Sequence, residues 1–245
     1  TLSLEECRSV LDHVIQVNSG RLPIVAGLFG GNDTRLLLRR IEQFHFQGID
    51  AIMSSSPAYN KPTQEGIFQH YLAIAESAPV PVLIYNVPGR TASNIEAETV
   101  LNLAQASDNF LGIKEASGDM VQAMHILRDK PDDFLLLSGD DPTAFPLIAM
   151  GGDGLISVIG NAFPAEFSAM VHHALRGQIE QARAYNDLLL DLHPWLYIDG
   201  NPAGIKSLLH ELELCAKEVR LPLTTMNKEH SRALREELRK VLAKR

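Results

Sequence analysis

The strongest constraint on the fold is the alternation of apolar, strand-like runs with amphipathic helical segments. The strand-like runs begin near Leu22, Asp50, Pro81, Phe110, Phe134 and Gly154. Helical segments follow most of them, at residues 33–47, 63–76, 95–106, 118–129, 142–150 and 164–175. A strand followed by a helix every 20 to 30 residues or so is typical of βα units and predicts an α/β protein with a parallel sheet.

Six βα units leave two architectures open. A closed (β/α)8 barrel needs eight strands, so either the sheet is open and doubly wound, or two further strands precede Thr1. After residue 175 the strand signal stops, and three helical segments remain at 178–191, 203–216 and 228–243. We therefore expect a partial-barrel catalytic domain over residues 1–175 and a helical domain over residues 176–245.

Length and charge narrow the class of protein. A chain of 245 residues is long enough for one barrel-sized core. Its formal net charge of −8 argues against a nucleic-acid partner, because such a surface carries a basic excess. No apolar run approaches the roughly 18 residues that cross a bilayer, so we expect no membrane segment. The two cysteines, Cys7 and Cys215, lack metal-site spacing and fit a reducing cytoplasm.

Lys114 stands out because it ends an otherwise apolar run that starts at Phe110. A buried ammonium loses hydration, so an amine retained here is expected to have a lowered pKa and to attack carbonyl groups. As a Schiff-base lysine it would condense with a 2-oxo acid, and the protonated imine would let the neighbouring carbon lose a proton without a metal or cofactor. The alternative is a lysine that extends from the strand end to solvent.

Tyr85 and Arg90 flank the end of the preceding strand-like run, which starts at Val82. The C-terminal ends of adjacent barrel strands lie within side-chain reach, so Tyr85 is a candidate proton shuttle beside Lys114. Arg90, in the following loop, offers a carboxylate two parallel donors. The alternatives are a tyrosine with its hydroxyl at the sheet edge and an ordinary surface arginine.

Two other loops are candidates of lower specificity. Tyr59 and Asn60 follow a strand-like run at the same expected face of the sheet, and their alternative is a proline-bounded loop before a helix capped by Thr63. The stretch Gly30–Asp33 follows a strand and opens a helix, so weak anion binding there stays open.

We expect no metal site. The pair Asp140–Asp141 resembles metal ligands only superficially, because Pro142 marks a helix start and makes Asp141 the expected N-cap. The nine histidines show no ligand spacing.

Two stretches, Tyr85–Thr91 and Gly112–Ala116, closely resemble the signature of the dihydrodipicolinate synthase and N-acetylneuraminate lyase family. The segments Pro57–Thr63, Leu137–Asp141 and Gly154–Val158 support the resemblance, which covers essentially the whole chain. Within the family, the arginine at position 90 looks like the synthases rather than the sialic acid or hexonate aldolases.

The resemblance implies a (β/α)8 TIM barrel with a C-terminal helical domain. Such a lyase condenses pyruvate with L-aspartate 4-semialdehyde in lysine (diaminopimelate) biosynthesis, without a cofactor. Lys114 matches the Schiff-base lysine and Tyr85 the proton-relay tyrosine. Tyr59 matches a tyrosine that reaches into the neighbouring subunit's site, which implies a homodimer or homotetramer. Arg90 matches the carboxylate-binding arginine, and Ile156 matches a residue that lines the pyruvate pocket.

The sequence departs from the family pattern at its start. The family's first two βα units, including the loop that supplies a relay threonine, would end just before Thr1, and we expect them to be missing from this sequence. Two other functions therefore stay open. One is another pyruvate-dependent aldolase, which Arg90 argues against. The other is a non-catalytic paralogue that binds a small acid or serves as an assembly subunit.

Overall fold

The computed structural model describes residues 1–245 and divides into two compact units. The first unit is Leu2–Gly139, and the second is Asp140–Arg245 together with Thr1. The predicted α/β class is confirmed, because parallel strands alternate with helices along the chain. The predicted division into residues 1–175 and 176–245 stays a prediction.

The first unit is built on five parallel strands that pair in sequence order. They are β1 (Val25–Gly27), β2 (Ala51–Ser55), β3 (Val82–Asn86), β4 (Phe110–Glu115) and β5 (Leu135–Ser138). All five begin within a few residues of the predicted starts. Because their direction is the same, their C-terminal ends, and the loops that follow, gather at one edge of the sheet.

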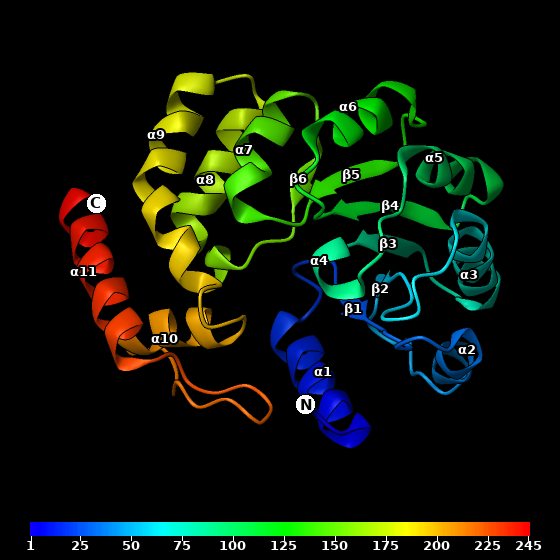
Figure 1. Cartoon of the computed structure of the whole chain (residues 1–245), viewed down its shortest axis with the longest axis horizontal. Coiled ribbons are helices and arrows are strands. Elements are labelled where there is room, and N and C mark those ends of the chain that lie inside the picture. Colours follow the sequence, from blue (N-terminus) through cyan, green and yellow to red (C-terminus); the bar gives the residue numbers. More distant parts are fainter. The chain divides into compact units, whose positions relative to one another are not determined.

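The helices that connect these strands run in the same order along the sheet (Figure 1). They are α2 (Thr34–Glu42), α3 (Gln64–Ser77), α5 (Ala97–Ala106) and α6 (Met120–Asp129). Thr63 caps α3 as predicted, since its side chain accepts a hydrogen bond from the Gly66 amide. The helix predicted at 33–47 ends at Glu42, five residues early, and a short helix, α4 (Pro88–Thr91), was not predicted.

Aliphatic side chains from both layers fill the core of the first unit. The fully or nearly fully buried members are Leu37, Ile52, Ile67, Ile74, Leu83, Ile84, Leu103, Ile113, Ile126 and Leu136. Strand β3 is buried at four of its five positions, which is why its sequence reads as a continuous apolar run rather than an alternating one. The polar positions on β3 and β4 therefore need a specific explanation.

The first helix, α1 (Leu4–Asn18), begins with a capping box. The Ser3 hydroxyl accepts from the Glu6 amide, and the Glu6 carboxylate accepts from the Ser3 amide. None of its residues is buried, although the sequence places apolar side chains along one face. No helix of the structure is both long and apolar enough to cross a membrane.

The second unit is mainly helical. Its elements are α7 (Asp141–Ala149), β6 (Gly154–Leu155), η1 (Ile159–Asn161), α8 (Pro164–Leu175), α9 (Ile179–Leu189), η2 (Leu190–Leu196), α10 (Ala203–Glu211) and α11 (Lys228–Lys244). Its core includes Phe163, Phe167, Met170, Leu192, Leu208, Leu234 and Leu238. The helix predicted at 203–216 ends at Glu211, where the chain turns through a positive φ at Glu213.

The predicted N-cap role of Asp141 is wrong. Asp140 occupies the N-cap position of α7, and Asp141 is the first helical residue. The buried Asp141 carboxylate instead accepts hydrogen bonds from the backbone amides of Val158 and Ile159, so it fixes the segment after β6. Burial and the nearby Asp141 raise the pKa of Asp140.

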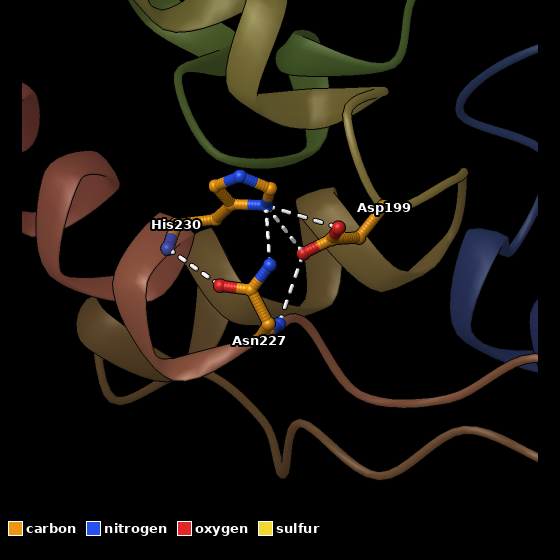
Figure 2. Close-up of polar contacts among 3 residues, drawn as sticks. All are labelled: Asp199, Asn227 and His230. Carbon is orange, nitrogen blue, oxygen red and sulfur yellow. Dashed lines mark hydrogen bonds and ion pairs between the residues drawn. The ribbon is translucent and has the colours of Figure 1, made fainter.

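A polar cluster ties the start of α11 to the segment after η2 (Figure 2). The Asn227 side chain caps α11 by accepting a hydrogen bond from the His230 backbone amide. The Asn227 backbone amide donates to the Asp199 carboxylate. His230 Nδ1 lies 2.9 Å from an Asp199 carboxylate oxygen. Partial burial disfavours the Asp199 carboxylate, but the Asn227 amide and His230 outweigh it and lower the pKa of Asp199.

Candidate active site

A bulge near the start of β4 sets which residues of β3 and β4 face each other. Val82 pairs with Phe110, but the next residue, Leu83, pairs with Gly112, so Leu111 is left out of the ladder. The shift places Tyr85 directly opposite Lys114. Residues directly opposite each other share a face of the sheet, so both side chains leave from the same side. Without the bulge, Tyr85 would face Ile113.

Lys114 and Tyr85 are in direct contact. The Lys114 Nζ atom lies 4.2 Å from the centroid of the Tyr85 ring. Lys114 is only 9% exposed, whereas Tyr85 is half-buried. The electron-rich ring face stabilises positive charge on the nitrogen, and burial withdraws that charge from water. The pair therefore places an amine and a phenol side by side at the C-terminal ends of β3 and β4.

Glycine at the end of β5 leaves room for the lysine. A Cβ atom at Gly139 would lie 3.2 Å from the Lys114 Cε atom and 2.6 Å from the Ala116 Cβ atom. The Gly139 amide also donates to the Glu115 carbonyl at 2.6 Å, which joins this turn to the end of β4. A larger side chain at 139 would therefore force Ala116 to shift and would crowd the end of the Lys114 side chain. Sequence reasoning did not identify Gly139 as a site residue.

A buried tyrosine on α3 fixes the strand ends next to the lysine. The Tyr71 hydroxyl donates to the backbone carbonyl of Ser54 at 2.9 Å and contacts that of Tyr85 at 3.4 Å. Burial raises the pKa of Tyr71, and the hydrogen bond with the Tyr85 backbone opposes that rise. The phenol therefore stays protonated and keeps the ends of β2 and β3 together.

Arg90 lies in α4, immediately beyond β3, with an exposed side chain. Pro88 starts this helix, and Ala92 ends it in the left-handed conformation, at φ 65°. A proline at the first helical position is already in helical φ, so the loop is well defined. The guanidinium is thus held on a short, ordered helix rather than on an open loop.

Tyr59 is 87% exposed and lies in the left-handed region, at φ 73°. Its amide donates to the Thr91 carbonyl at 3.2 Å, so the loop after β2 is tied to the end of the helix that carries Arg90. The strained backbone and the exposed ring mean that Tyr59 contributes no packing to its own unit. Strained backbone conformations of this kind cluster at functional sites.

The structure brings together some of the predicted site residues. Lys114 and Tyr85 are in contact, and the loops of Tyr59 and Arg90 are hydrogen bonded through Thr91. Ile156 follows β6 in the second unit and is half-buried there.

Sequence reasoning missed a buried polar network on the opposite face of the same strands. Its members are Asn86, Asn94, Glu115 and Gln122. A signal was present, because a polar residue directly follows both Tyr85 and Lys114. Consecutive strand residues point to opposite faces, so Asn86 and Glu115 lie behind the sheet, where a buried polar group needs hydrogen-bond partners.

The model of the dihydrodipicolinate synthetase family matches residues 1–241. Among curated proteins, the chain is 49% identical over 223 residues to a 4-hydroxy-tetrahydrodipicolinate synthase of Cytophaga hutchinsonii, covering 91% of this chain and 74% of that protein. It is 46% identical over 244 residues to the Parabacteroides distasonis protein of the same name, covering 100% of this chain and 82% of that one.

Solved structures of dihydrodipicolinate synthases also resemble the chain. The dihydrodipicolinate synthase of Thermotoga maritima superposes with a TM-score of 0.95 at 32% identity, covering 98% of this chain and 82% of that one. The enzyme of Acinetobacter baumannii, solved in complex with pyruvate, gives a TM-score of 0.94 at 38% identity with the same coverage. These neighbours fit an α/β fold of the TIM-barrel type.

Proposed function

The chain belongs to the dihydrodipicolinate synthetase family, and from that membership we propose a lyase that condenses pyruvate with L-aspartate 4-semialdehyde to give 4-hydroxy-tetrahydrodipicolinate. The observation that carries the proposal is the contact between the buried Lys114 amine and the Tyr85 ring at the C-terminal ends of β4 and β3. Parallel-barrel enzymes build their active sites at this end of the strands.

Lys114 would act as the nucleophile. Its neutral amine attacks the keto carbon of pyruvate and water leaves, which gives a protonated imine on Nζ. The imine withdraws electrons from the pyruvate methyl carbon, which then loses a proton and becomes an enamine. The face of the Tyr85 ring, 4.2 Å from Nζ, stabilises the positive charge of the imine.

Tyr85 would move protons in these steps. Its hydroxyl belongs to a side chain that leaves the sheet beside Nζ, so it is well placed to protonate the leaving hydroxide and to accept the methyl proton. The enamine carbon then attacks the aldehyde carbon of the semialdehyde and forms the new C–C bond. The amino group of the second substrate finally attacks the imine carbon, closes the ring and releases Lys114.

Two further residues would complete the site. Arg90 would bind a substrate carboxylate. That Ile156 lines the pyruvate pocket stays a prediction of the family resemblance. Tyr59, exposed and strained in its own chain, would enter the site of a second subunit. The homodimer or homotetramer inferred from Tyr59 stays a prediction. We also propose that the parallel strands belong to a (β/α)8 barrel and that residues 176–245 form a helical domain.

Replacing Arg90 by alanine tests the substrate assignment. Hydrogen bonds to a charged group contribute about 1.5 to 3 kcal/mol, so kcat/KM for aspartate semialdehyde should fall roughly tenfold to a hundredfold. Formation of the pyruvate imine should continue, because it does not involve that carboxylate.

The matched control for this variant is Arg39→Ala, which removes an exposed arginine from α2. It should leave both steps unchanged. Equal loss of imine formation and of condensation in Arg90→Ala would show that Arg90 supports the fold. Faster turnover of another aldehyde by the unaltered protein would identify a different pyruvate-dependent aldolase.

A further inference from the structure

Glu115, the last residue of β4, carries a carboxylate that is only 4% exposed. Uncharged amide groups donate hydrogen bonds to this carboxylate. The Ser117 amide donates to Oε1 at 2.6 Å, and the side-chain amides of Asn86 and Gln122 each donate to Oε2 at 2.9 Å. A buried charge is costly unless it is hydrogen bonded, so retention of this one calls for a role.

The position of Glu115 links it to the lysine next to it. Adjacent residues of a strand point to opposite faces, so Lys114 faces the site and Glu115 faces the helices. The same holds on β3, where Asn86 follows Tyr85. The register pairs Tyr85 with Lys114 and Asn86 with Glu115. The hydrogen bond between Asn86 and Glu115 therefore joins the two strands directly behind the reactive pair.

The network extends from these strands to two connecting segments. Asn86 donates to the Asn94 side chain at 2.8 Å, and Asn94 donates to Gln122 at 2.7 Å. Gln122 lies in α6 and returns to Glu115, which closes a ring of hydrogen bonds. Asn86 also accepts from the Ile95 amide at the entrance to α5. No buried side-chain nitrogen or oxygen of the four members lacks a hydrogen-bond partner, which favours one fixed arrangement of the ring.

We infer that Glu115 is the positioning residue for Lys114. It does not touch the substrate. It clamps the end of β4 to β3 through Asn86 and to α6 through Gln122, and thereby holds Nζ over the Tyr85 ring. The inference rests on the proposed function, because it assigns Glu115 a part in forming the pyruvate imine.

Glu115→Gln is the direct test. Both oxygens of Glu115 accept hydrogen bonds. Glutamine replaces one of these oxygens by an NH₂ group, which would then face a donor of Asn86, Gln122 or Ser117. We expect the rate of pyruvate trapping by borohydride to fall about tenfold or more, because small misplacements of a reacting group carry large rate costs. KM for pyruvate should change by less than about threefold, since binding contacts remain.

The exchange variant Glu115→Gln/Gln122→Glu separates positioning from loss of stability. After the exchange, the new amide on β4 can accept from the Ser117 backbone and donate to the new carboxylate on α6. That carboxylate still accepts from Asn94, and Asn86 can donate to the remaining oxygen at position 115, which lies 3.2 Å from its amide nitrogen in the unaltered protein. The ring then closes again with the charge moved to α6. The trapping rate should return to within about threefold of the unaltered protein, a coupling typical of directly contacting residues. No recovery, in a variant that melts like the unaltered protein, would overturn the inference.

Asn109→Ala is the matched control. Asn109 is also a partly buried amide, but it binds the Ala75 and Ala78 carbonyls at the opposite end of the sheet. It should lower the melting temperature and leave trapping unchanged. If Glu115→Gln does not fold, Gln122→Met removes the donor to Glu115 and the acceptor for Asn94 but leaves the carboxylate its Asn86 and Ser117 donors. An unchanged trapping rate in that variant would contradict the inference.

The two proposals fail differently. Absence of trapping in the unaltered protein would refute the proposed function. Normal trapping in the unaltered protein and in Glu115→Gln would refute only the positioning role.

Discussion

Replacing Tyr85 by phenylalanine lowers kcat by about 10²-fold to 10⁴-fold, the contribution expected of a positioned proton-transfer group. The aromatic ring remains over Lys114, so the contact between ring and nitrogen survives and the amine stays in place. Loss of the hydroxyl alone then accounts for the fall. Steady-state rates with both substrates, together with thermal melting, measure this effect.

Tyr185→Phe is the control for that variant. It removes the same atom from a half-buried tyrosine of α9 in the second unit and should leave kcat unchanged. If Tyr85→Phe keeps more than a third or so of the activity, proton transfer does not depend on this hydroxyl.

The second large effect is acid destabilisation through His70. This side chain is 6% exposed, and its Nδ1 atom contacts the Thr34 hydroxyl at 2.8 Å. Burial lowers the pKa of His70 to about 4, and the Ser55 backbone partly opposes that change. The unfolded chain binds the proton near the ordinary value of 6.5, so it takes up protons first as the pH falls.

The stabilising contribution is therefore complete above about pH 6.5 and decreases as the pH falls toward 4. At about 1.4 kcal/mol for each pH unit, His70 alone removes about 3 kcal/mol of unfolding free energy over this range. Urea unfolding measured between pH 4 and 7.5 gives the dependence of the unfolding free energy on pH. Since Tyr71 on the same helix fixes the carbonyl of Tyr85, activity should decline with stability.

A matched pair of variants tests whether His70 causes the loss of unfolding free energy at acid pH. His70→Gln should flatten the acid side of the stability profile, whereas His13→Gln, at an exposed position of α1, should preserve it. An acid slope that is the same in His70→Gln and in the unaltered protein would show that other groups cause it.

Much of the fold could be predicted because periodicity records which faces are buried. The strand starts at Asp50, Pro81, Phe110 and Phe134 are close to the observed strands, and the helix at 164–175 matches α8. Helix ends were less predictable. The helix from residue 33 stops at Glu42 although apolar residues continue to Phe46, and the Phe44 amide donates to the Ile41 carbonyl three residues back, so a tight turn ends the helix.

The proximity of Lys114 and Tyr85 could be predicted from the sequence, but the bulge and the hydrogen bonds that support it could not. Lys114 and Tyr85 are chemically conspicuous at the ends of apolar runs. The bulge at Leu111, which makes them face each other, has only Gly112 beside it as a signal in the sequence, and a glycine in a strand does not fix the register. The wrong N-cap assignment of Asp141 has a similar cause, since the amides of Val158 and Ile159 that it binds are distant in sequence. Long-range hydrogen bonds are invisible to local patterns.

Reductive trapping tests the central claim most directly. Incubation of the protein with pyruvate and borohydride should add one reduced pyruvyl group per chain, located at Lys114 by peptide mass, because imine formation requires a desolvated amine. Lys114→Ala should give no adduct, whereas Lys130→Ala, which removes a lysine that binds the Phe134 carbonyl, should be labelled normally. An adduct at another lysine, or none in the unaltered protein, would contradict the proposed mechanism.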